Sequence, residues 1–379
     1  MTHVFVYEVV HLDWIIPLAH FMDAAEYKVT FYTSESFESD LRESLQDLYH
    51  RFTWIYDKPE TGNRAFYQKF NHAISGSAYD IILLNSVDSK HLLLYTILAG
   101  KKRSKIVFNV HDVNNFFQAK FGINLRKNIR TIGKKLLHTL IDAFIVNADE
   151  MRQYISETNL TTKPVFWLPP VICTPRIQTR RQEPFTIVVP GSIDWKRRDY
   201  DALLLLLNSL SDALANRIKL IIAGRPVGDY GRMIISQCSQ LQAKGFAIEY
   251  FDEEIPEVKF QSIISQSDVI LSPLQRETAI HDNISEKYGM TKGSGNVYDA
   301  IRHAKPLILP DHVQVYGAIS SSCIKYNGIE HLKEIIQLML ENQDYYNEYQ
   351  SEAYKNALLF QEKEMKQRFK NIIVSVKAL

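Results

Sequence analysis

Short apolar runs alternate with helical segments along most of this 379-residue chain, and this alternation restricts the fold more than any other feature. In the first half, the runs are rich in β-branched and aromatic residues and occupy residues 3–10, 28–34, 80–86, 105–112 and 143–149. Apolar strands that are separated by helices are typical of parallel sheets covered on both faces. The first half is therefore predicted to be a doubly wound α/β domain.

The same pattern begins again after a stretch rich in proline and arginine, "PPVICTPRIQTRRQEP", whose composition is typical of a linker. Further apolar runs follow at 185–192, 218–226, 247–253, 268–274 and 306–310. The last residues contain neither Gly nor Pro and are predicted to be helical. We expect a first domain of residues 1–170, a linker of 171–184, a second domain of 185–345 and a C-terminal helix of 346–379, whose return to the first domain is left open.

Composition and charge exclude several classes of protein. Lys and Arg (44) nearly balance Asp and Glu (43), so the net charge of +1 gives no overall argument for binding nucleic acid. The three cysteines, Cys173, Cys238 and Cys323, are widely spaced, which fits reduced thiols and excludes a disulfide framework or a cysteine-rich zinc site. The N-terminus has no basic leader, and the most apolar runs are about half the ~20 residues that a membrane span needs. We expect a cytoplasmic protein that is not integral to a membrane.

The segment "TKGSGNVYDAIRHAKPLILP", residues 291–310, places a glycine loop directly before a predicted helix. Apolar residues in "NVYDAIRHA" recur at helical spacing, and Pro306 ends the helix. The loop Lys292–Gly295 therefore precedes a helix N-terminus, where free amides and the helix dipole favour an anion. Its two glycines let the backbone approach a ligand, and Lys292 adds a positive charge. The alternative is an ordinary turn between a strand and a helix.

Cations also follow other predicted strands of the second domain. They are Lys196, Arg197 and Arg198 after the first strand, Arg225 after the second, and Arg276, with His281 and Asp282 nearby, after the fourth. Each cluster alone fits a solvated surface. Because the carboxyl ends of parallel strands share one edge of the sheet, the clusters together predict a diphosphate site, which Arg could bind with two hydrogen bonds.

Four segments carry a family resemblance: "PGSIDWKRRDYDALLLLL", "KLIIAGRP", "DVILSPL" and "TKGSGNVYDAIRHAKPLIL". They resemble the C-terminal domain of GT-B-fold glycosyltransferases, family 4 in particular, over most of residues 185–310. The resemblance implies two Rossmann-like domains that face a central cleft, with an acceptor side first and a donor side second. It implies a hexosyltransferase that moves a sugar from a nucleotide-diphosphate sugar to a hydroxyl acceptor, either a glycan or a lipid-linked glycan of polysaccharide synthesis. No metal or other cofactor is expected.

The resemblance also assigns roles to residues of the diphosphate site. Lys196 matches the lysine that neutralises the donor diphosphate, and Arg197 or Arg198 would supplement it. The loop amides, with Lys292 beside them, would hold the distal phosphate; these amides belong to Gly293, Ser294, Gly295 and Asn296.

The sugar and ribose side departs from the family pattern. Asp299 matches the second acid of a pair that binds ribose hydroxyls, although the family has Glu. Thr291 stands where the family has the first acid, which contacts the transferred sugar, and Glu286 or Asp282 would have to substitute. Arg225 is placed on the same donor side.

In the first half, "KIVFNVHDVNNFF" ends a predicted strand at His111 and Asp112. Family 4 enzymes have a histidine at a similar place, facing the donor sugar. His111 would donate a hydrogen bond to a sugar hydroxyl or take a proton, and Asp112 would act as a base if the enzyme inverts. The alternative is that Asp112 caps the next helix. His11 and Asp13 follow the first strand and are either acceptor-side residues or structural.

Residues 101–135 are strongly basic, with ten Lys and Arg against the single acid Asp112. Within 125–140, apolar residues recur at helical spacing. This pattern fits a solvated helix face, or a helix that attaches the protein to the anionic inner face of the cell membrane. Aromatic residues are too sparse for a nucleic-acid stacking platform, so no nucleic-acid partner is expected.

Two other functions remain open at the level of sequence. Nucleotide-sugar 2-epimerases share the expected architecture. A non-catalytic nucleotide-sugar-binding protein is the third reading, to which Thr291 lends weight.

Overall fold

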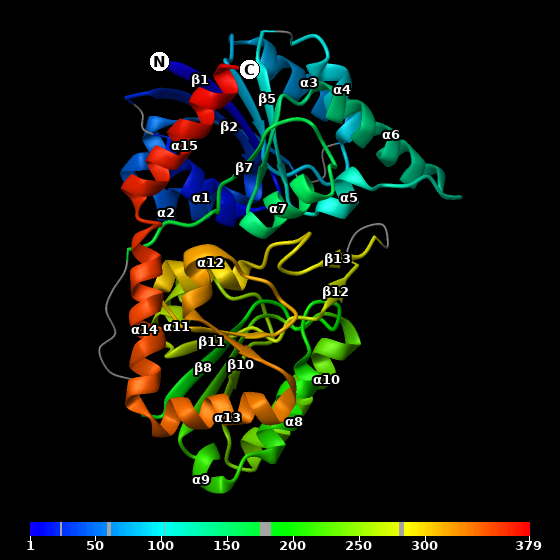
Figure 1. Cartoon of the computed structure of the whole chain (residues 1–379). Coiled ribbons are helices and arrows are strands. Elements are labelled where there is room, and N and C mark those ends of the chain that lie inside the picture. Colours follow the sequence, from blue (N-terminus) through cyan, green and yellow to red (C-terminus); the bar gives the residue numbers. More distant parts are fainter. Residues whose placement is uncertain (23–24, 59–61, 102, 175–182, 280–283) are drawn as a thin grey trace. The chain divides into compact units, whose positions relative to one another are not determined.

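The computed structural model describes residues 1–22, 25–58, 62–101, 103–174, 183–279 and 284–379 (Figure 1). These residues divide into two compact units. Unit 1 comprises Met1–Pro170 and Glu362–Leu379 together with Ile284, and unit 2 comprises the rest between Val171 and Gln361. His281, Asp282 and the greater part of the predicted linker lie outside the described residues.

Unit 1 is built on a seven-stranded parallel sheet in the order β3-β2-β1-β4-β5-β6-β7. Its strands are β1 (Thr2–Glu8), β2 (Tyr27–Ser34), β3 (Thr53–Asp57), β4 (Ile81–Leu84), β5 (Lys105–Val110), β6 (Ala143–Val146) and β7 (Val165–Trp167). Its helices are α1 (Leu12–Phe21), α2 (Glu38–Leu45), α3 (Asn63–Ser75), α4 (His91–Leu98), α5 (Val113–Phe117), α6 (Leu125–Leu140), α7 (Asp149–Glu157) and α15 (Glu362–Lys377), with short 3-10 helices η1 (Glu35–Phe37) and η2 (Gln46–Arg51). The strand order reverses between β1 and β4, and ligands of such sheets bind beyond the strand ends at the reversal.

Unit 2 repeats the design with a six-stranded parallel sheet in the order β10-β9-β8-β11-β14-β15. Its strands are β8 (Phe185–Pro190), β9 (Ile218–Ala223), β10 (Ala247–Tyr250), β11 (Val269–Leu271), β14 (Leu307–Pro310) and β15 (Cys323–Tyr326), with a small hairpin of β12 (Glu277–Thr278) and β13 (Glu286–Lys287). Its helices are α8 (Tyr200–Ser209), α9 (Asp212–Ala215), α10 (Gly228–Ala243), α11 (Glu257–Gln266), α12 (Gly295–His303), α13 (Gly328–Glu341) and α14 (Gln343–Leu358), with 3-10 helix η3 (Gly317–Ser322). Here the order reverses between β8 and β11.

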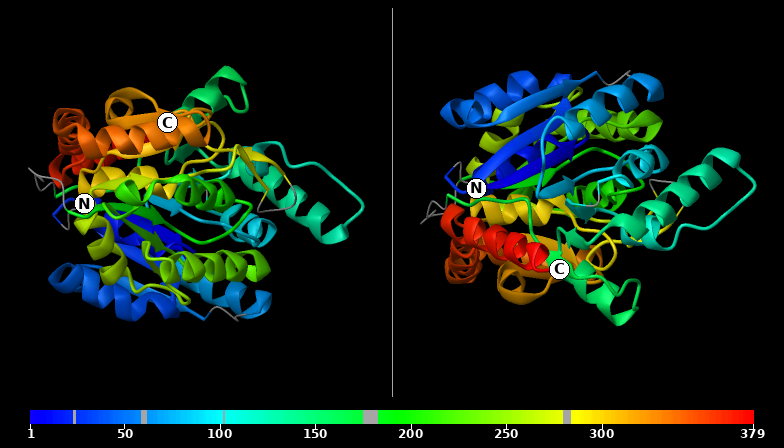
Figure 2. Two further views of the ribbon diagram at one scale, coloured as in Figure 1. Left: turned by 90° about the horizontal axis from the view of Figure 1, so that it is seen from below. Right: turned by 90° about the horizontal axis from the view of Figure 1, so that it is seen from above.

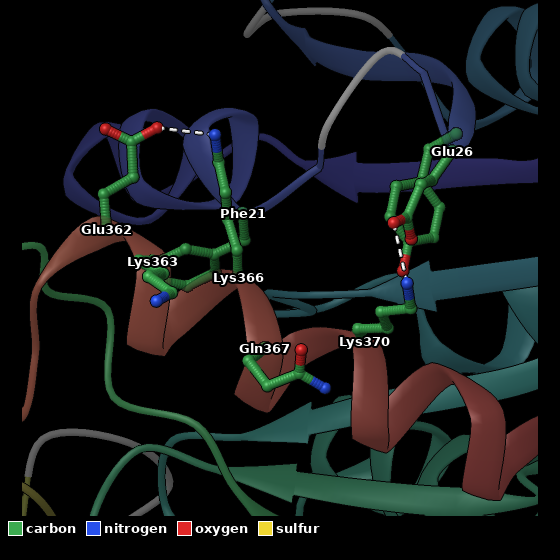
Figure 3. A pocket seen from close by; sticks show the side chains of 8 residues that line it. Phe21, Glu26, Glu362, Lys363, Lys366, Gln367 and Lys370 are labelled. Carbon is green, nitrogen blue, oxygen red and sulfur yellow. Dashed lines mark hydrogen bonds and ion pairs between the residues drawn. The ribbon is translucent and has the colours of Figure 1, made fainter.

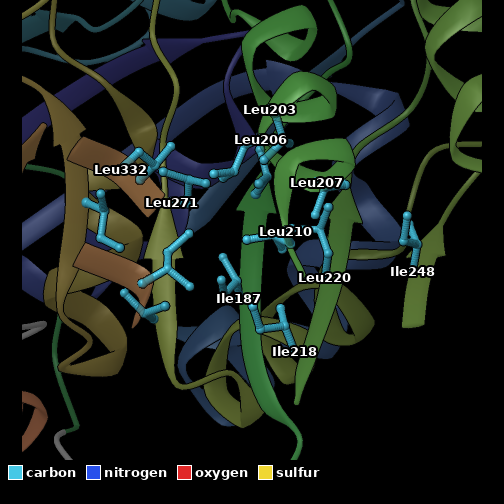
Figure 4. Close-up of a cluster of buried hydrophobic side chains, with 14 of the residues drawn as sticks. Ile187, Leu203, Leu206, Leu207, Leu210, Ile218, Leu220, Ile248, Leu271 and Leu332 are labelled. Atoms are coloured by element: carbon cyan, nitrogen blue, oxygen red, sulfur yellow. The ribbon is translucent and has the colours of Figure 1, made fainter. Parts of the chain in front are cut away.

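The core of unit 2 explains why its apolar runs form these elements. Figure 4 shows Leu203, Leu206 and Leu207 of α8 gathered beside Ile187 of β8 and Leu220 of β9. All five side chains are buried. Burying such side chains stabilises by roughly 1.5–3 kcal/mol each, so the leucine-rich run of α8 is held against the sheet.

Each predicted strand region contains a strand, and the fold class is confirmed, but sequence reasoning missed the hairpin strands β12 and β13 and three strands of the parallel sheets. β3 lies at the edge of its sheet and is half-buried, so it lacks the continuous apolar run that marked the others. β7 has three residues, and β15 carries a lysine. Short or edge strands are too weakly apolar for periodicity to reveal them.

The C-terminal tail forms two helices, α14 and α15, where a single helix over 346–379 was expected. The break falls at residues 359–361, which contain neither Gly nor Pro. Phe360 is buried, and its carbonyl accepts a hydrogen bond from the Cys173 amide at 2.9 Å. Packing within unit 2 therefore ends α14, which local sequence does not encode.

α15 packs against the rest of unit 1, beside α1 and the start of β2 (Figures 1 and 2). Phe369 contacts Phe21 and Tyr27, with ring centroids 6.3 and 5.8 Å apart. A hollow of about 440 Å³ lies here, lined mainly by α15 (Figure 3). Lys370 pairs with Glu26 across it at 2.7 Å.

No helix within the described ranges is long and apolar enough to cross a membrane.

Candidate functional site

The strand reversal of unit 2 is organised by two glycines at strand ends. Gly191 follows β8 with φ of 93°, a conformation that favours glycine, and a Cβ at this position would overlap the Arg198 guanidinium. A Cβ on Gly224, after β9, would overlap the Gly191 carbonyl. These close approaches bring the two strand ends together and place Arg198 directly over the end of β8.

Arg198 is fixed at the start of α12. Its side chain is 8% exposed; Nη2 donates to Asn296 Oδ1 at 3.0 Å and Nη1 to the Ser192 carbonyl at 3.2 Å. Its Nε is buried and has no hydrogen-bond partner among the described residues. A buried donor without an acceptor is costly, so this guanidinium would gain from one more anionic or carbonyl oxygen; Arg197 Nε is buried without a hydrogen-bond partner in the same way.

Asn296 connects both sides of the strand reversal. Its Oδ1 also accepts from Ser272 Oγ, after β11, at 2.6 Å, and its Nδ2 donates to the Pro190 carbonyl of β8 at 3.1 Å. The oxygen and the nitrogen of this side chain are therefore both bound inside unit 2. Its backbone amide is left for the phosphate-holding role that the sequence predicted.

The first turn of α12 has unused donors. Ser294 is the N-cap, and its side chain makes no capping hydrogen bond. Within the described part of the chain, no atom accepts from the amides of Ser294 and Gly295. A Cβ on Gly295 would meet nothing within 4 Å, so a side chain at this first position of α12 would project into open space. Free amides and the helix dipole make this a site for an anion.

The other predicted cations lie in different surroundings. Lys196 is exposed; its amide donates to Asp194 Oδ1 at 3.0 Å, and its ammonium lies 5.9 Å from the centroid of a Trp195 ring. Arg197 pairs with Asp194 at 3.6 Å, and Arg225 pairs with Glu254 at 3.7 Å. Of the three consecutive cations, only Arg198 has an interaction with α12 among the described residues.

Of the residues predicted on the ribose and sugar side, Thr291 and Asp299 are buried, whereas Arg225 is exposed. The Thr291 hydroxyl accepts from the Lys287 amide at 2.7 Å and holds the turn before the loop. The Lys292 amide donates to the Lys287 carbonyl at 3.1 Å. Asp299 lies 3.9 Å from Arg302 on α12, and Glu286 is buried in β13.

A buried carboxylate, which sequence reasoning missed, lies at the strand reversal of unit 1. Glu8 ends β1 and is 0% exposed; its Oε1 accepts from the amides of Val10 and His11 at 2.7 and 2.8 Å. Its Oε2 accepts from Asn85 Nδ2 and Ser86 Oγ, both at 2.5 Å. Burial raises the pKa of Glu8, and His11 and these hydrogen bonds oppose that rise. An acid that ends an otherwise apolar strand was the available signal.

His111 lies next to this carboxylate. Its Nε2 is 3.0 Å from Ser86 Oγ and 2.8 Å from the Asn85 carbonyl. Its ring stacks on His11 with centroids 5.0 Å apart and meets Trp14 edge-on at 5.4 Å. The structure thus brings together two histidines that the sequence placed in separate roles.

Both predicted acids of unit 1 lie beside these histidines. Asp112 is the N-cap of the five-residue α5, yet its side chain makes no capping hydrogen bond. Asp13 is half-exposed and lies 3.8 Å from His11 Nδ1. Among the described residues, no group of three or more His, Cys, Asp or Glu could hold a metal ion.

Comparisons with known proteins address the whole chain. No protein-family model matches the sequence, and no curated protein sequence matches it. Among solved structures, sucrose-phosphate synthase from Thermosynechococcus elongatus is similar with a TM-score of 0.67 at 14% identity, covering 100% of both chains. The Anabaena protein HepE, in complex with UDP and glucose, has a TM-score of 0.66 at 12% identity over 99% of this chain and 100% of that one. UDP-GlcNAc 2-epimerase from Neisseria meningitidis, bound to UDP-GlcNAc, has a TM-score of 0.60 at 11% identity over 99% of both chains.

At such low identity these similarities establish the fold and nothing finer. Two parallel-sheet α/β units, similar over the full length to these proteins, give the chain the GT-B fold.

Proposed function

We propose that the chain is a family 4 type glycosyltransferase, which moves a sugar from a nucleotide-diphosphate sugar to a hydroxyl acceptor. One observation carries the proposal: the buried Arg198 guanidinium, with an unpartnered Nε, lies at the open N-terminus of α12. Fixed cations and free amides are what a leaving diphosphate needs, because they stabilise its charge without reorganising during the reaction. In this proposal the diphosphate requires no divalent ion.

The remaining donor-side residues are proposed around this centre. Lys196 and Arg197, on the turn before Arg198, and Lys292, before the glycine loop, would add positive charge toward the phosphates. Asp299 on α12 would reach the ribose, as the family pattern has it. In unit 1, His111 and Asp112 would serve the transferred sugar, with His11 and Asp13 on the acceptor side.

The solved structures with the same fold support a nucleotide sugar as the ligand. HepE was crystallised with UDP and glucose, and the Neisseria epimerase with UDP-GlcNAc. We therefore propose uridine diphosphate sugars as the first donors to test.

A thermal-shift comparison of UDP, GDP, ADP, CMP and dTDP tests the diphosphate site, since a ligand that binds the folded state raises Tm. We expect a nucleoside diphosphate to raise Tm. Gly295→Val should abolish that rise while leaving the unliganded Tm within about a degree or two, because the new side chain meets no protein atom but would crowd an anion bound at the adjacent amides. Val297→Ile, two residues along α12, is the matched control and should keep the rise.

Arg198→Lys tests the guanidinium in the same assay. Lysine keeps the charge but loses the fork of donors, so the nucleotide-dependent rise should shrink strongly. Arg217→Lys is the control, because Arg217 donates to the Leu340 carbonyl at 2.9 Å and has no part in the proposed site. No rise with any nucleotide, or an unchanged rise in both Gly295→Val and Arg198→Lys, would contradict the proposed site.

A nucleotide-sugar 2-epimerase is the second candidate, and the similarity to UDP-GlcNAc 2-epimerases favours testing it. An epimerase needs no acceptor. Two incubations with UDP-GlcNAc, one without and one with an added acceptor, separate the two functions. Epimerised sugar in the NMR spectrum of the first supports the epimerase. UDP release that depends on the acceptor supports the transferase. Nucleotide-sugar binding without either product would favour the non-catalytic protein.

We also propose that unit 1 attaches at the cytoplasmic face of a membrane through α6, near a lipid-linked acceptor. The helix extends away from the sheet of unit 1 (Figures 1 and 2), and it packs on the protein through Thr131, Lys134 and Leu137. Apolar side chains point outward instead, in α6 and the loop before it. These exposed residues are Phe121, Ile123, Leu125, Ile129 and Ile132.

The charges around this apolar surface favour an anionic membrane as its partner. The cations Lys120, Arg126 and Lys135 are exposed beside it, and residues 113–141 contain no acid. Basic residues around exposed apolar side chains fit the interface of an anionic bilayer, where each cation contributes about 1 kcal/mol.

Co-sedimentation with vesicles of phosphatidylcholine, with and without phosphatidylglycerol, tests the membrane surface. We expect binding to the anionic vesicles that weakens with salt. Arg126→Glu should weaken it by about tenfold or more, because two charges are changed. Ile123→Ser should weaken it without changing the salt dependence, and Lys244→Glu, an exposed lysine of unit 2, should not affect it. Equal binding to both vesicle types, or none, would exclude the proposal.

A further inference from the structure

We propose that the exposed indole ring of Trp195 is the surface on which the base of a nucleoside diphosphate stacks. The phosphates of that ligand would lie at Arg198 and the first turn of α12, so this role of Trp195 rests on the proposed function. The base, in contrast, has no partner among the residues proposed so far.

Trp195 differs from the other tryptophans in its surroundings. It is 59% exposed, whereas the ring of Trp54 stacks on those of Phe31 and Tyr49 with centroids 4.7 and 5.0 Å apart. Among the described residues no aromatic ring contacts that of Trp195, and the ammonium of Lys196 lies 5.9 Å from its centroid. A single exposed apolar side chain is ordinary on a protein surface, so exposure alone does not indicate a site.

The turn that carries Trp195 is fixed by hydrogen bonds on both sides. The Ile193 amide donates to the Arg225 carbonyl at 2.9 Å, in the loop after β9. On the other side the Arg197 carbonyl accepts from the Gln275 amide at 3.0 Å, in the segment after β11. A ring on a turn held in this way loses little freedom when a ligand binds to it, which favours affinity.

The same turn places the indole beside the proposed diphosphate site. The Arg198 amide donates to the Asp194 carbonyl at 3.0 Å, and Trp195 and Arg198 lie three residues apart within the turn that this bond closes. Their Cα atoms therefore lie within about 7 Å of each other. Their side chains take different directions, because Arg198 is 8% exposed and Trp195 59%. One nucleoside diphosphate can reach both, with its phosphates at the guanidinium and its base on the indole.

The groups around Trp195 favour a base over a sugar ring. The hydroxyl groups of a sugar need hydrogen-bond acceptors, but both carboxylate oxygens of Asp194 are engaged. Oδ1 accepts from the Lys196 amide at 3.0 Å, and Oδ2 lies 3.6 Å from Arg197 Nε. The loop that pairs with this turn presents Val227, an apolar side chain that is 40% exposed. A base needs no such acceptor, because its face stacks on an aromatic ring.

Calorimetric titration of the full-length chain with inorganic pyrophosphate, UDP, ADP and UDP-GlcNAc separates the base from the phosphates. Trp195→Ala should weaken the binding of the three nucleotides by about fivefold to a hundredfold, because the stacking is lost, and should leave that of pyrophosphate unchanged. ADP should lose more than UDP, because a purine covers more of the ring. Trp195→Phe should keep most of the affinity. Leu205→Ala, which truncates a 60% exposed side chain of α8, is the matched control and should change none of the four.

Indole fluorescence gives a second readout. A stacked base quenches an indole, so ADP should reduce the fluorescence of the unmodified protein more than that of Trp195→Phe, and pyrophosphate should affect neither. Equal losses of pyrophosphate and nucleotide affinity in Trp195→Ala would mean that the residue only supports the turn. A loss confined to UDP-GlcNAc would mean that it holds the sugar. Either result, or no loss at all, would overturn the stacking role alone. If the unmodified protein binds none of the four probes, the proposed diphosphate site itself fails, and the stacking role with it.

Discussion

At the scale of single residues, Gly191 and Gly245 share a backbone conformation but differ in their surroundings. Both have φ near +95°, at 93° and 99°, but a Cβ at 191 would overlap Arg198, whereas one at 245 would meet nothing within 4 Å. Gly245→Ala should therefore cost only backbone strain, about 1 kcal/mol. Gly191→Ala should cost about 1–2 kcal/mol more and should remove the nucleotide-dependent rise in Tm, because Arg198 must move. Urea unfolding measures both, and equal costs would show that Arg198 is not held against the backbone.

The residue scale also shows where sequence reasoning stopped. The glycine loop, the helix after it and the cations after β8 were predicted, because strand ends and helix starts follow from local patterns. The sequence did not predict which of the three consecutive cations points inward. The Asp194 carbonyl accepts from the amides of both Arg197 and Arg198, and this turn directs the Arg198 side chain inward. Glu8 was missed because its partners come from the distant β4 end.

At the scale of elements, the packing of α6 on α4 buries a histidine. A Cβ on Gly133 of α6 would lie 2.5 Å from the Leu92 amide nitrogen, so the two helices approach closely over His91. His91 is 2% exposed; burial, with the nearby Lys134 and Arg130 charges, lowers its pKa to about 3.

This burial predicts a loss of stability in acid. The pKa of His91 in the folded chain lies below that in the unfolded chain. The stability that depends on neutral His91 is therefore fully present above about pH 6.5 and is lost as pH falls toward 3. Between pH 7.5 and 5.5 it should amount to about 1.4 kcal/mol. In urea unfolding at both pH values, the free energy of unfolding of His91→Gln should fall less between pH 7.5 and 5.5 than that of the unmodified protein. The difference between the two losses should equal that amount. The exposed His50→Gln should keep the full loss; a His91→Gln variant that also keeps it would mean that His91 does not resist protonation.

Elements differ in how far the sequence specifies them. Strands buried on both faces were predicted because their apolar runs are continuous, as in β4. The break between α14 and α15 was not, because it depends on a hydrogen bond from Cys173, far away in the chain. In α6 the helical period was clear, but which face packs inward was not: Thr131 and Lys134 are buried while Ile129 and Ile132 are exposed.

At the scale of the whole molecule, the chain returns in α15 to the unit in which it began. The folding of unit 1 and the proposed site of unit 2 therefore depend on different segments of the chain. Unit 1 needs the C-terminal helix, whose Phe369 is buried against Phe21 and Tyr27. The proposed diphosphate site lies within unit 2 and contains no atom of α15. A defect in α15 should therefore weaken the folding of unit 1 and leave nucleotide binding intact.

Phe369→Ala in the full-length chain tests this division. Removing a fully buried phenyl ring should destabilise unit 1 by about 3–5 kcal/mol, whereas Val374→Ala on the same helix, 61% exposed, should stay within about 0.5 kcal/mol. Calorimetry with and without the nucleotide that gives the largest shift should show an earlier transition for Phe369→Ala. The nucleotide should still stabilise the later transition by the increment seen in the unmodified protein. If the nucleotide increment disappeared with the phenyl ring, nucleotide binding would depend on unit 1 as well, and the anion site at Arg198 and α12 would not be sufficient to account for it.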